Sequence, residues 1–105
     1  MNTRIASCFL TMLVYACVPH VSYAGDPALG KKAAARCAGC HGVTGISAAP
    51  NYPDLAGQKE AYLIKVIKDY RSGERNDRTM AAMVGPLAEE DLEHLAAYYS
   101  SLPAR

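Results

Sequence analysis

The sequence contains no tryptophan, one phenylalanine and four cysteines, and these shortages limit what can hold the protein together. Phe9 and two of the cysteines, Cys8 and Cys17, fall within the first 24 residues, so tyrosine supplies the aromatic mass of the rest. Chains this short rarely stabilise themselves through side-chain packing alone and usually contain a covalent link, a metal or a bound group. After residue 24 only Cys37 and Cys40 remain, so a structural disulfide and any other use of thiols compete for one pair.

An excess of charge of one sign is also absent. The chain has 11 lysines and arginines against 10 aspartates and glutamates, and the only charged residue among the first 24 is Arg4. Without those 24 residues the protein is formally neutral. This balance argues against nucleic acid or an anionic membrane surface as a partner and limits membrane contact to transient docking.

Residues 1–24 have the pattern of a cleaved secretory signal peptide. Arg4 supplies a short positive start, Ile5–Val18 is largely apolar, and Ser22-Tyr23-Ala24 places small residues at the cleavage positions. The apolar run is shorter than the roughly 20 residues that a membrane-spanning helix needs, although an uncleaved anchor is the alternative. The sequence therefore predicts a periplasmic protein whose single domain is 25–105.

The most informative motif is Cys37-Ala38-Gly39-Cys40-His41, which reads C-x-x-C-H, the pattern of c-type haem attachment. On a helical turn, both thiols and the imidazole fall on one face and reach the same flat cofactor. Cys37 and Cys40 would hold the porphyrin edge covalently, and neutral His41 would give a ring nitrogen to iron. A haem held in this way would also be the staple that so small a chain needs.

Two other interpretations use the same cysteines. C-x-x-C alone also occurs in redox disulfides and as half of a zinc site. A zinc site needs about four ligands, but after residue 24 there is no second cysteine pair and only one other histidine, His94. A thioredoxin-like protein needs a βαβ context, and no strand pattern is visible. The pattern therefore favours haem.

The periodicity of apolar residues predicts an all-α protein with three main helices. The first begins at Asp26-Pro27, a favourable cap and first helical residue, and ends near Gly42. The second runs from about Lys59 to Ser72 and the last from about Glu89 to Ser101, each with an apolar stripe. The stripe of the second helix contains Tyr62, Leu63, Val66, Ile67 and Tyr70. Val43–Gln58 is rich in glycine and proline and predicts a long loop wrapped around one side of the haem.

The group that binds the iron opposite His41 determines whether the haem transfers electrons or binds external ligands. The candidate ligands are Met80, Met83 and His94, and spacing alone does not separate the two methionines. His94 follows two acidic residues on its helix and is better explained by a solvated or paired face. If neither methionine binds iron, an open sixth position would make the protein a gas sensor or a haem enzyme.

With these residues in view, the chain resembles the class I cytochrome c family, in particular small monohaem proteins of the cytochrome c553 and cytochrome c4-domain type. The resemblance rests on blocks that occur in the family's order: Cys37-Ala38-Gly39-Cys40-His41-Gly42, Ala49-Pro50-Asn51-Tyr52-Pro53, Leu55-Ala56-Gly57-Gln58, Met80, Met83, Leu87, Glu90-Asp91-Leu92 and Ala96-Ala97-Tyr98-Tyr99.

The resemblance implies a cytochrome c fold around one covalently attached haem c and its iron. It implies Met80 rather than Met83 as the axial ligand, because Met80 precedes Leu87 by seven positions. It also implies that the carbonyl of Pro50 accepts a hydrogen bond from His41. Gly30, with Leu95 and Tyr98, matches the contact at which the first and last helices cross.

The function implied is that of an electron carrier and not an enzyme. Its partners would be redox proteins, such as a membrane oxidase or reductase, a cytochrome bc1-type complex or a periplasmic dehydrogenase. A dedicated electron-transfer subunit of a dehydrogenase complex is a close variant of this role.

Overall fold

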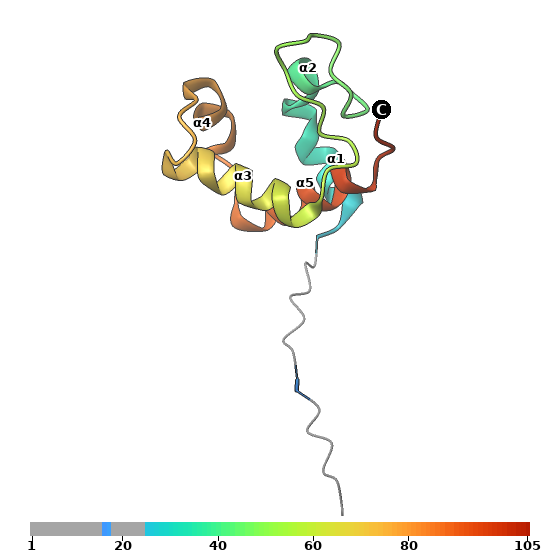
Figure 1. Cartoon of the computed structure of the whole chain (residues 1–105), viewed down its shortest axis with the longest axis vertical. Coiled ribbons are helices and arrows are strands. Elements are labelled where there is room, and N and C mark those ends of the chain that lie inside the picture. The colour runs from blue at the N-terminus through green and yellow to red at the C-terminus, as the bar shows by residue number, and fades with distance from the viewer. Residues whose placement is uncertain (1–15, 18–24) are drawn as a thin grey trace, which may run out of the picture.

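The computed structural model describes residues 16–17 and 25–105, and these residues form helices and loops without a β-strand (Figure 1). The segment predicted to be a signal peptide lies outside the described residues, apart from Ala16 and Cys17. No helix in the described part is long and apolar enough to cross a membrane. The helices in chain order are α1 Pro27–Ala33, α2 Ala38–His41, α3 Glu60–Ser72, α4 Arg78–Val84 and α5 Glu89–Ser101.

The predicted second and last helices are confirmed as α3 and α5, but the first is divided. After α1 the chain tightens into a 3₁₀ turn, Ala34–Arg36, in which Cys37 N–H donates to the Ala34 carbonyl at 2.9 Å. The short helix α2 follows. The segment around Met80, which is not among the three predicted helices, forms α4, and its N-terminus is capped by Asp77, whose Oδ1 accepts from the Met80 N–H at 2.9 Å.

The core lies mainly on α5. Leu92 is completely buried, and with Leu95, Ala96 and Tyr99 it forms the buried face that the helical period predicts. Helix α3 contributes Leu63 and Ile64 to this core. Val84, at the end of α4, and Leu87, just before α5, are also buried in it. The stripe predicted for α3 needs one correction: Tyr62 is 45% exposed, and Ile64 is buried in its place. Helix α3 is therefore rotated slightly from the orientation that aromatic residues alone suggest.

Helices α1 and α5 cross at Gly30. An added Cβ at Gly30 would lie 1.9 Å from the His94 carbonyl oxygen and 2.6 Å from the Tyr98 Cβ, so only hydrogen fits between the two backbones. The same crossing is tied by a hydrogen bond from the Asp26 backbone N–H to His94 Nδ1 at 2.9 Å. His94 thus joins the two helices through the backbone at Asp26, a partner that the sequence-based explanation did not name.

The loop between α2 and α3 folds back on itself. The N–H groups of Leu55 and Ala56 donate to the Gly45 carbonyl at 2.8 and 3.0 Å, and Gly57 N–H donates to the Tyr99 carbonyl at 2.9 Å. The loop is therefore anchored to α5 just before α3 begins.

We expect Gly30→Ala to destabilise the protein by about 1–3 kcal/mol, because the new methyl group forces the two helices apart. The matched control is Gly39→Ala in α2, where a Cβ would meet no atom within 4 Å in the described part of the chain. Chemical unfolding of the two variants measures the difference. Equal stability of the Gly30 and Gly39 variants would show that the crossing tolerates a side chain.

Candidate functional site

The C-x-x-C-H motif forms the turn that includes α2. Cys37 caps this helix, and its carbonyl accepts from the N–H groups of Cys40 at 3.3 Å and His41 at 2.9 Å. The structure therefore brings both cysteines and the histidine together on one helical turn, as the spacing predicts. Cys37 is half-buried, Cys40 is exposed, and His41 is buried with 6% of its surface accessible.

The environment of Cys37 does not favour catalysis of disulfide exchange. Cys37 and Cys40 are free cysteines, and burial raises the pKa of Cys37, partly offset by a hydrogen bond with Tyr99. Thiols that catalyse disulfide exchange have the opposite property, a lowered pKa that maintains the thiolate. Within the described residues, no group of three or more histidine, cysteine, aspartate or glutamate side chains is placed to hold a metal.

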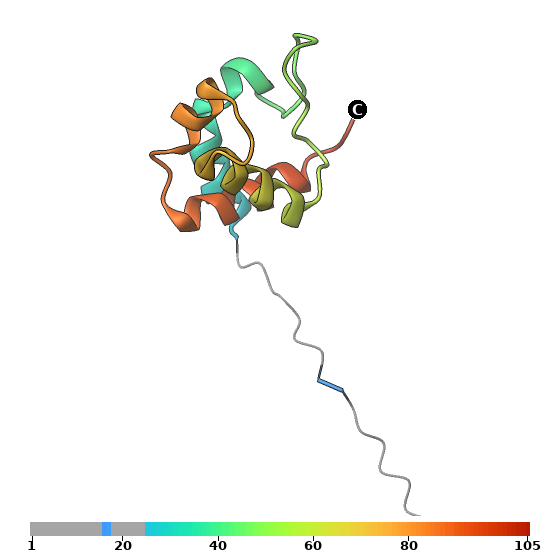
Figure 2. The same ribbon diagram turned by 60° about the vertical axis from the view of Figure 1, so that its left-hand side comes forward.

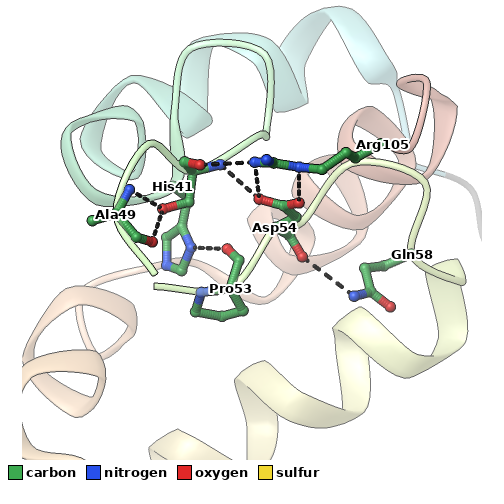
Figure 3. A network of polar contacts seen from close by, with 7 residues as sticks. His41, Ala49, Pro53, Asp54, Gln58 and Arg105 are labelled. Carbon is green, nitrogen blue, oxygen red and sulfur yellow. Dashed lines mark hydrogen bonds and ion pairs between the residues drawn. The ribbon is translucent and has the colours of Figure 1, made fainter. Parts of the chain in front are cut away.

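His41 is held in one orientation by the loop that follows it. Its Nδ1 lies 2.8 Å from the Pro53 carbonyl oxygen, and a dashed line marks this contact in Figure 3. A carbonyl can only accept, so Nδ1 carries a proton, and in the neutral imidazole Nε2 then keeps its lone pair. The hydrogen bond thus fixes the tautomer in which a neutral imidazole can bind a metal through Nε2.

This contact corrects the assignment of Pro50. The sequence-based prediction gave the carbonyl next to His41 to Pro50, but the structure gives it to Pro53. Pro50 is exposed within a turn in which the Tyr52 N–H donates to the Ala49 carbonyl at 3.3 Å. Two prolines three residues apart are equally good turn formers, so composition does not distinguish them. Asp54, the residue after Pro53, anchors the loop through contacts with Ser47 and Arg105 that the sequence alone does not show.

The Pro53 segment lies in a network of polar contacts. Asp54 Oδ1 accepts from the Ser47 N–H at 2.7 Å, and the Ser47 hydroxyl donates to the Ala49 carbonyl at 2.8 Å. Arg105 pairs with the Asp54 carboxylate, with Nε 3.1 Å from Oδ2. The pKa of Asp54 is lowered, first by the Ser47 N–H and then by Arg105, because both favour the ionised carboxylate.

Both candidate methionines lie on α4, and each is half-buried. Met80 packs against the hydrophobic core. The end of α4 is held by Arg71 of α3, which donates to the carbonyls of Val84, at 3.2 Å, and Leu87, and pairs with Glu89 at 3.0 Å. Because Arg71 fixes the connection between α4 and α5, it also fixes the helix that carries Met80.

Helices α2 and α4 stand on the same side of α3 and α5 in both views (Figures 1 and 2). Apolar side chains from several elements pack against the core but are only partly covered: Cys37, Leu55, Ile67, Tyr70 and Met80. A small protein with two free thiols, an imidazole with Nε2 available and this partly covered apolar surface fits a covalently attached haem. These features define a helical haem-attachment protein.

Comparison with known proteins identifies the family. A family model for cytochrome c matches residues 27–103. The chain is 42% identical to cytochrome c4 of Pseudomonas aeruginosa over 101 residues, which cover 96% of this chain and 49% of that protein. It is 46% identical to cytochrome c-554(548) of Halomonas halodenitrificans over 81 residues, which cover 74% of this chain and 98% of that one. The crystal structure of reduced recombinant cytochrome c4 from Pseudomonas stutzeri matches with a TM-score of 0.72 at 44% identity, over 76% of this chain and 47% of that one.

The chain therefore belongs to the cytochrome c family and has the cytochrome c fold. Membership implies a covalently attached haem c with its iron as the cofactor. The chain spans about half the length of the cytochrome c4 relatives that it matches.

The lowered pKa of Asp54 gives a pH dependence of stability with a defined sign. Its stabilising contribution is fully present above the ordinary carboxyl pKa of 3.8 and is lost as the pH falls through the lower folded-state pKa. We expect Asp54→Asn to lower the Tm at neutral pH, and we expect the gap from wild type to narrow below about pH 4. Thermal unfolding across this pH range measures the gap.

The control for this experiment is Asp69→Asn. Asp69 pairs with Lys65 one turn away on α3, and ion pairs at this helical spacing contribute only about 0.3–0.5 kcal/mol. A gap between wild type and Asp54→Asn that stays constant down to about pH 2 would contradict the role given to the ionised carboxylate.

Proposed function

We propose that the protein is a single-haem electron carrier in which Cys37 and Cys40 form the thioether links and His41 binds iron through Nε2. The haem supplies a one-electron couple, and the chain holds it, orients it and limits the access of water. The observation that carries the proposal is the 2.8 Å contact between His41 Nδ1 and the Pro53 carbonyl. It prepares Nε2 as a ligand and makes the imidazole a better electron donor.

Met80 is the proposed second axial ligand. Its thioether is a soft, neutral ligand that favours ferrous iron and raises the reduction potential. Support comes from the position of α4 on the same side of α3 and α5 as α2, and from the packing of Met80 on the core. Met83 then fills space in the haem pocket, as flexible methionine side chains often do.

We further propose that residues 1–24 are a cleaved signal peptide and that 25–105 act in the periplasm as one cytochrome c domain. Its partners are redox proteins: a membrane oxidase or reductase, a bc1-type complex or a periplasmic dehydrogenase. A nearly neutral chain provides little long-range electrostatic steering, so docking depends on a small patch around an exposed haem edge. Permanent assembly with a dehydrogenase is a variant of the same role.

The competing function is a gas sensor or haem enzyme with an open sixth position. It requires that neither Met80 nor Met83 binds iron, so the ligand state of the haem separates the two functions. A bound thioether blocks the position at which carbon monoxide would bind ferrous iron.

We expect the purified protein to show a c-type absorption spectrum, a weak red band from methionine sulfur on ferric iron, and no prompt change when carbon monoxide is added to the reduced form. Met80→Ala removes the red band and opens the iron to carbon monoxide, because a methyl group cannot replace the sulfur ligand. Absorption spectra of both oxidation states test this.

The matched control is Met83→Ala, which removes a methionine of the same helix and should keep the red band. A prompt carbon monoxide shift in the wild-type protein would contradict the carrier role and support the open-site function. Loss of the red band in the Met83 variant alone would transfer the ligand role to Met83.

A further inference from the structure

Arg105 reaches across the loop that supports His41. Its Nη2 donates to the Ser47 carbonyl at 2.9 Å and lies 3.4 Å from Asp54 Oδ1, while Nε lies 3.1 Å from Asp54 Oδ2 (Figure 3). Asp54 Oδ1 also accepts from the Ser47 N–H. Residues 47 and 54 are thereby joined both directly and through one guanidinium group. We refer to Ser47, Asp54 and Arg105 together as the Asp54 clamp.

The clamp is one peptide unit away from the acceptor of the haem histidine. Pro53, whose carbonyl faces His41 Nδ1, directly precedes Asp54. The backbone carbonyl of Asp54 is held in turn by Gln58 Nε2 at 3.2 Å. Because Asp54 is held through both its side chain and its backbone, the direction of the Pro53 carbonyl is largely determined by Asp54.

We infer that Asp54 and Arg105 are positioning residues that keep the Pro53 carbonyl aligned with His41 Nδ1 and so help to set the reduction potential of the haem. This inference rests on the proposed function. A well-aligned acceptor at Nδ1 makes the imidazole more basic, and a more basic ligand stabilises ferric iron. Loosening the clamp weakens that acceptor and raises the potential.

A direct effect of charge on the iron gives a different pattern. Removing the negative charge of Asp54 would raise the potential, whereas removing the positive charge of Arg105 would lower it. Positioning predicts that both changes raise it. The direct effect is also weak here, because the side chains of Arg105 and Asp54 are 65% and 32% exposed and solvent screens them.

The test is the reduction potential of the haem-loaded protein in wild type, Asp54→Asn, Arg105→Gln and Arg105→Lys. We expect all three variants to shift the ferrous-to-ferric ratio at fixed ambient potential by about threefold toward ferrous, a rise of about 28 mV given about 59 mV per tenfold change. Arg105→Lys is decisive because it keeps the charge but loses the planar fork that bridges Asp54 and Ser47.

A second measurement reports on alignment without using the potential. In the reduced protein, nuclear magnetic resonance follows the exchange of the His41 Nδ1 proton with solvent, which we expect to be several-fold faster in each clamp variant. The controls are Lys65→Gln and Asp69→Asn, which remove one charge of each sign from an ion pair on α3, away from the loop. Both controls should keep the wild-type potential and exchange rate.

The inference is overturned if Asp54→Asn and Arg105→Gln move the potential in opposite directions, or if the clamp variants match the controls in potential and in exchange. Either result leaves the proposed function intact, since the wild-type haem and its methionine band are measured first. A wild-type protein without haem, or with an open iron, would overturn the proposed function and this inference together.

Discussion

The close crossing of α1 and α5 is the contact on which the rest of the structure depends. It requires a glycine at position 30, where the two backbones leave no space for a side chain, and it is fastened by the Asp26–His94 hydrogen bond. Helix α1 leads through one tight turn into the Cys37–His41 segment, so the crossing positions this motif relative to the core on α5. The turn that contains Cys37, Cys40 and His41 is therefore positioned by the close contact of two helix backbones and not by the packing of large side chains.

Two arginine side chains hold the non-helical segments near the proposed haem position. Arg71 donates to two carbonyls in the connection from α4 to α5, and Arg105 donates to a carbonyl in the loop after α2. Loop carbonyls have no helical partner, and a planar guanidinium can satisfy several acceptors at once. Each arginine also pairs with one carboxylate, Glu89 or Asp54, which fixes the orientation of its fork. The two loops are thus ordered by side chains that come from distant parts of the chain.

The sequence predicted the elements that depend on local pattern. Helices α3 and α5 follow from apolar periodicity and good end signals, and the grouping of Cys37, Cys40 and His41 follows from helical geometry. It failed where the outcome depends on distant contacts. Whether Pro50 or Pro53 faces His41 depends on how the loop is held, and one of its holding contacts joins residues 58 positions apart. Similarly, the rotation of α3 that buries Ile64 and exposes Tyr62 is set by packing on α5.

The crossing at Gly30 also has a consequence for how the chain folds. The hydrogen bond that fastens it joins residues 68 positions apart, so the contact has a high sequence separation for a small helical protein. Closing a loop of that length costs entropy before the packing of α5 compensates for it. Without α5, helix α1 lacks the partner against which it packs in the folded chain. The placement of the turn with Cys37 and Cys40, which follows α1, is therefore completed only when the last helix has docked.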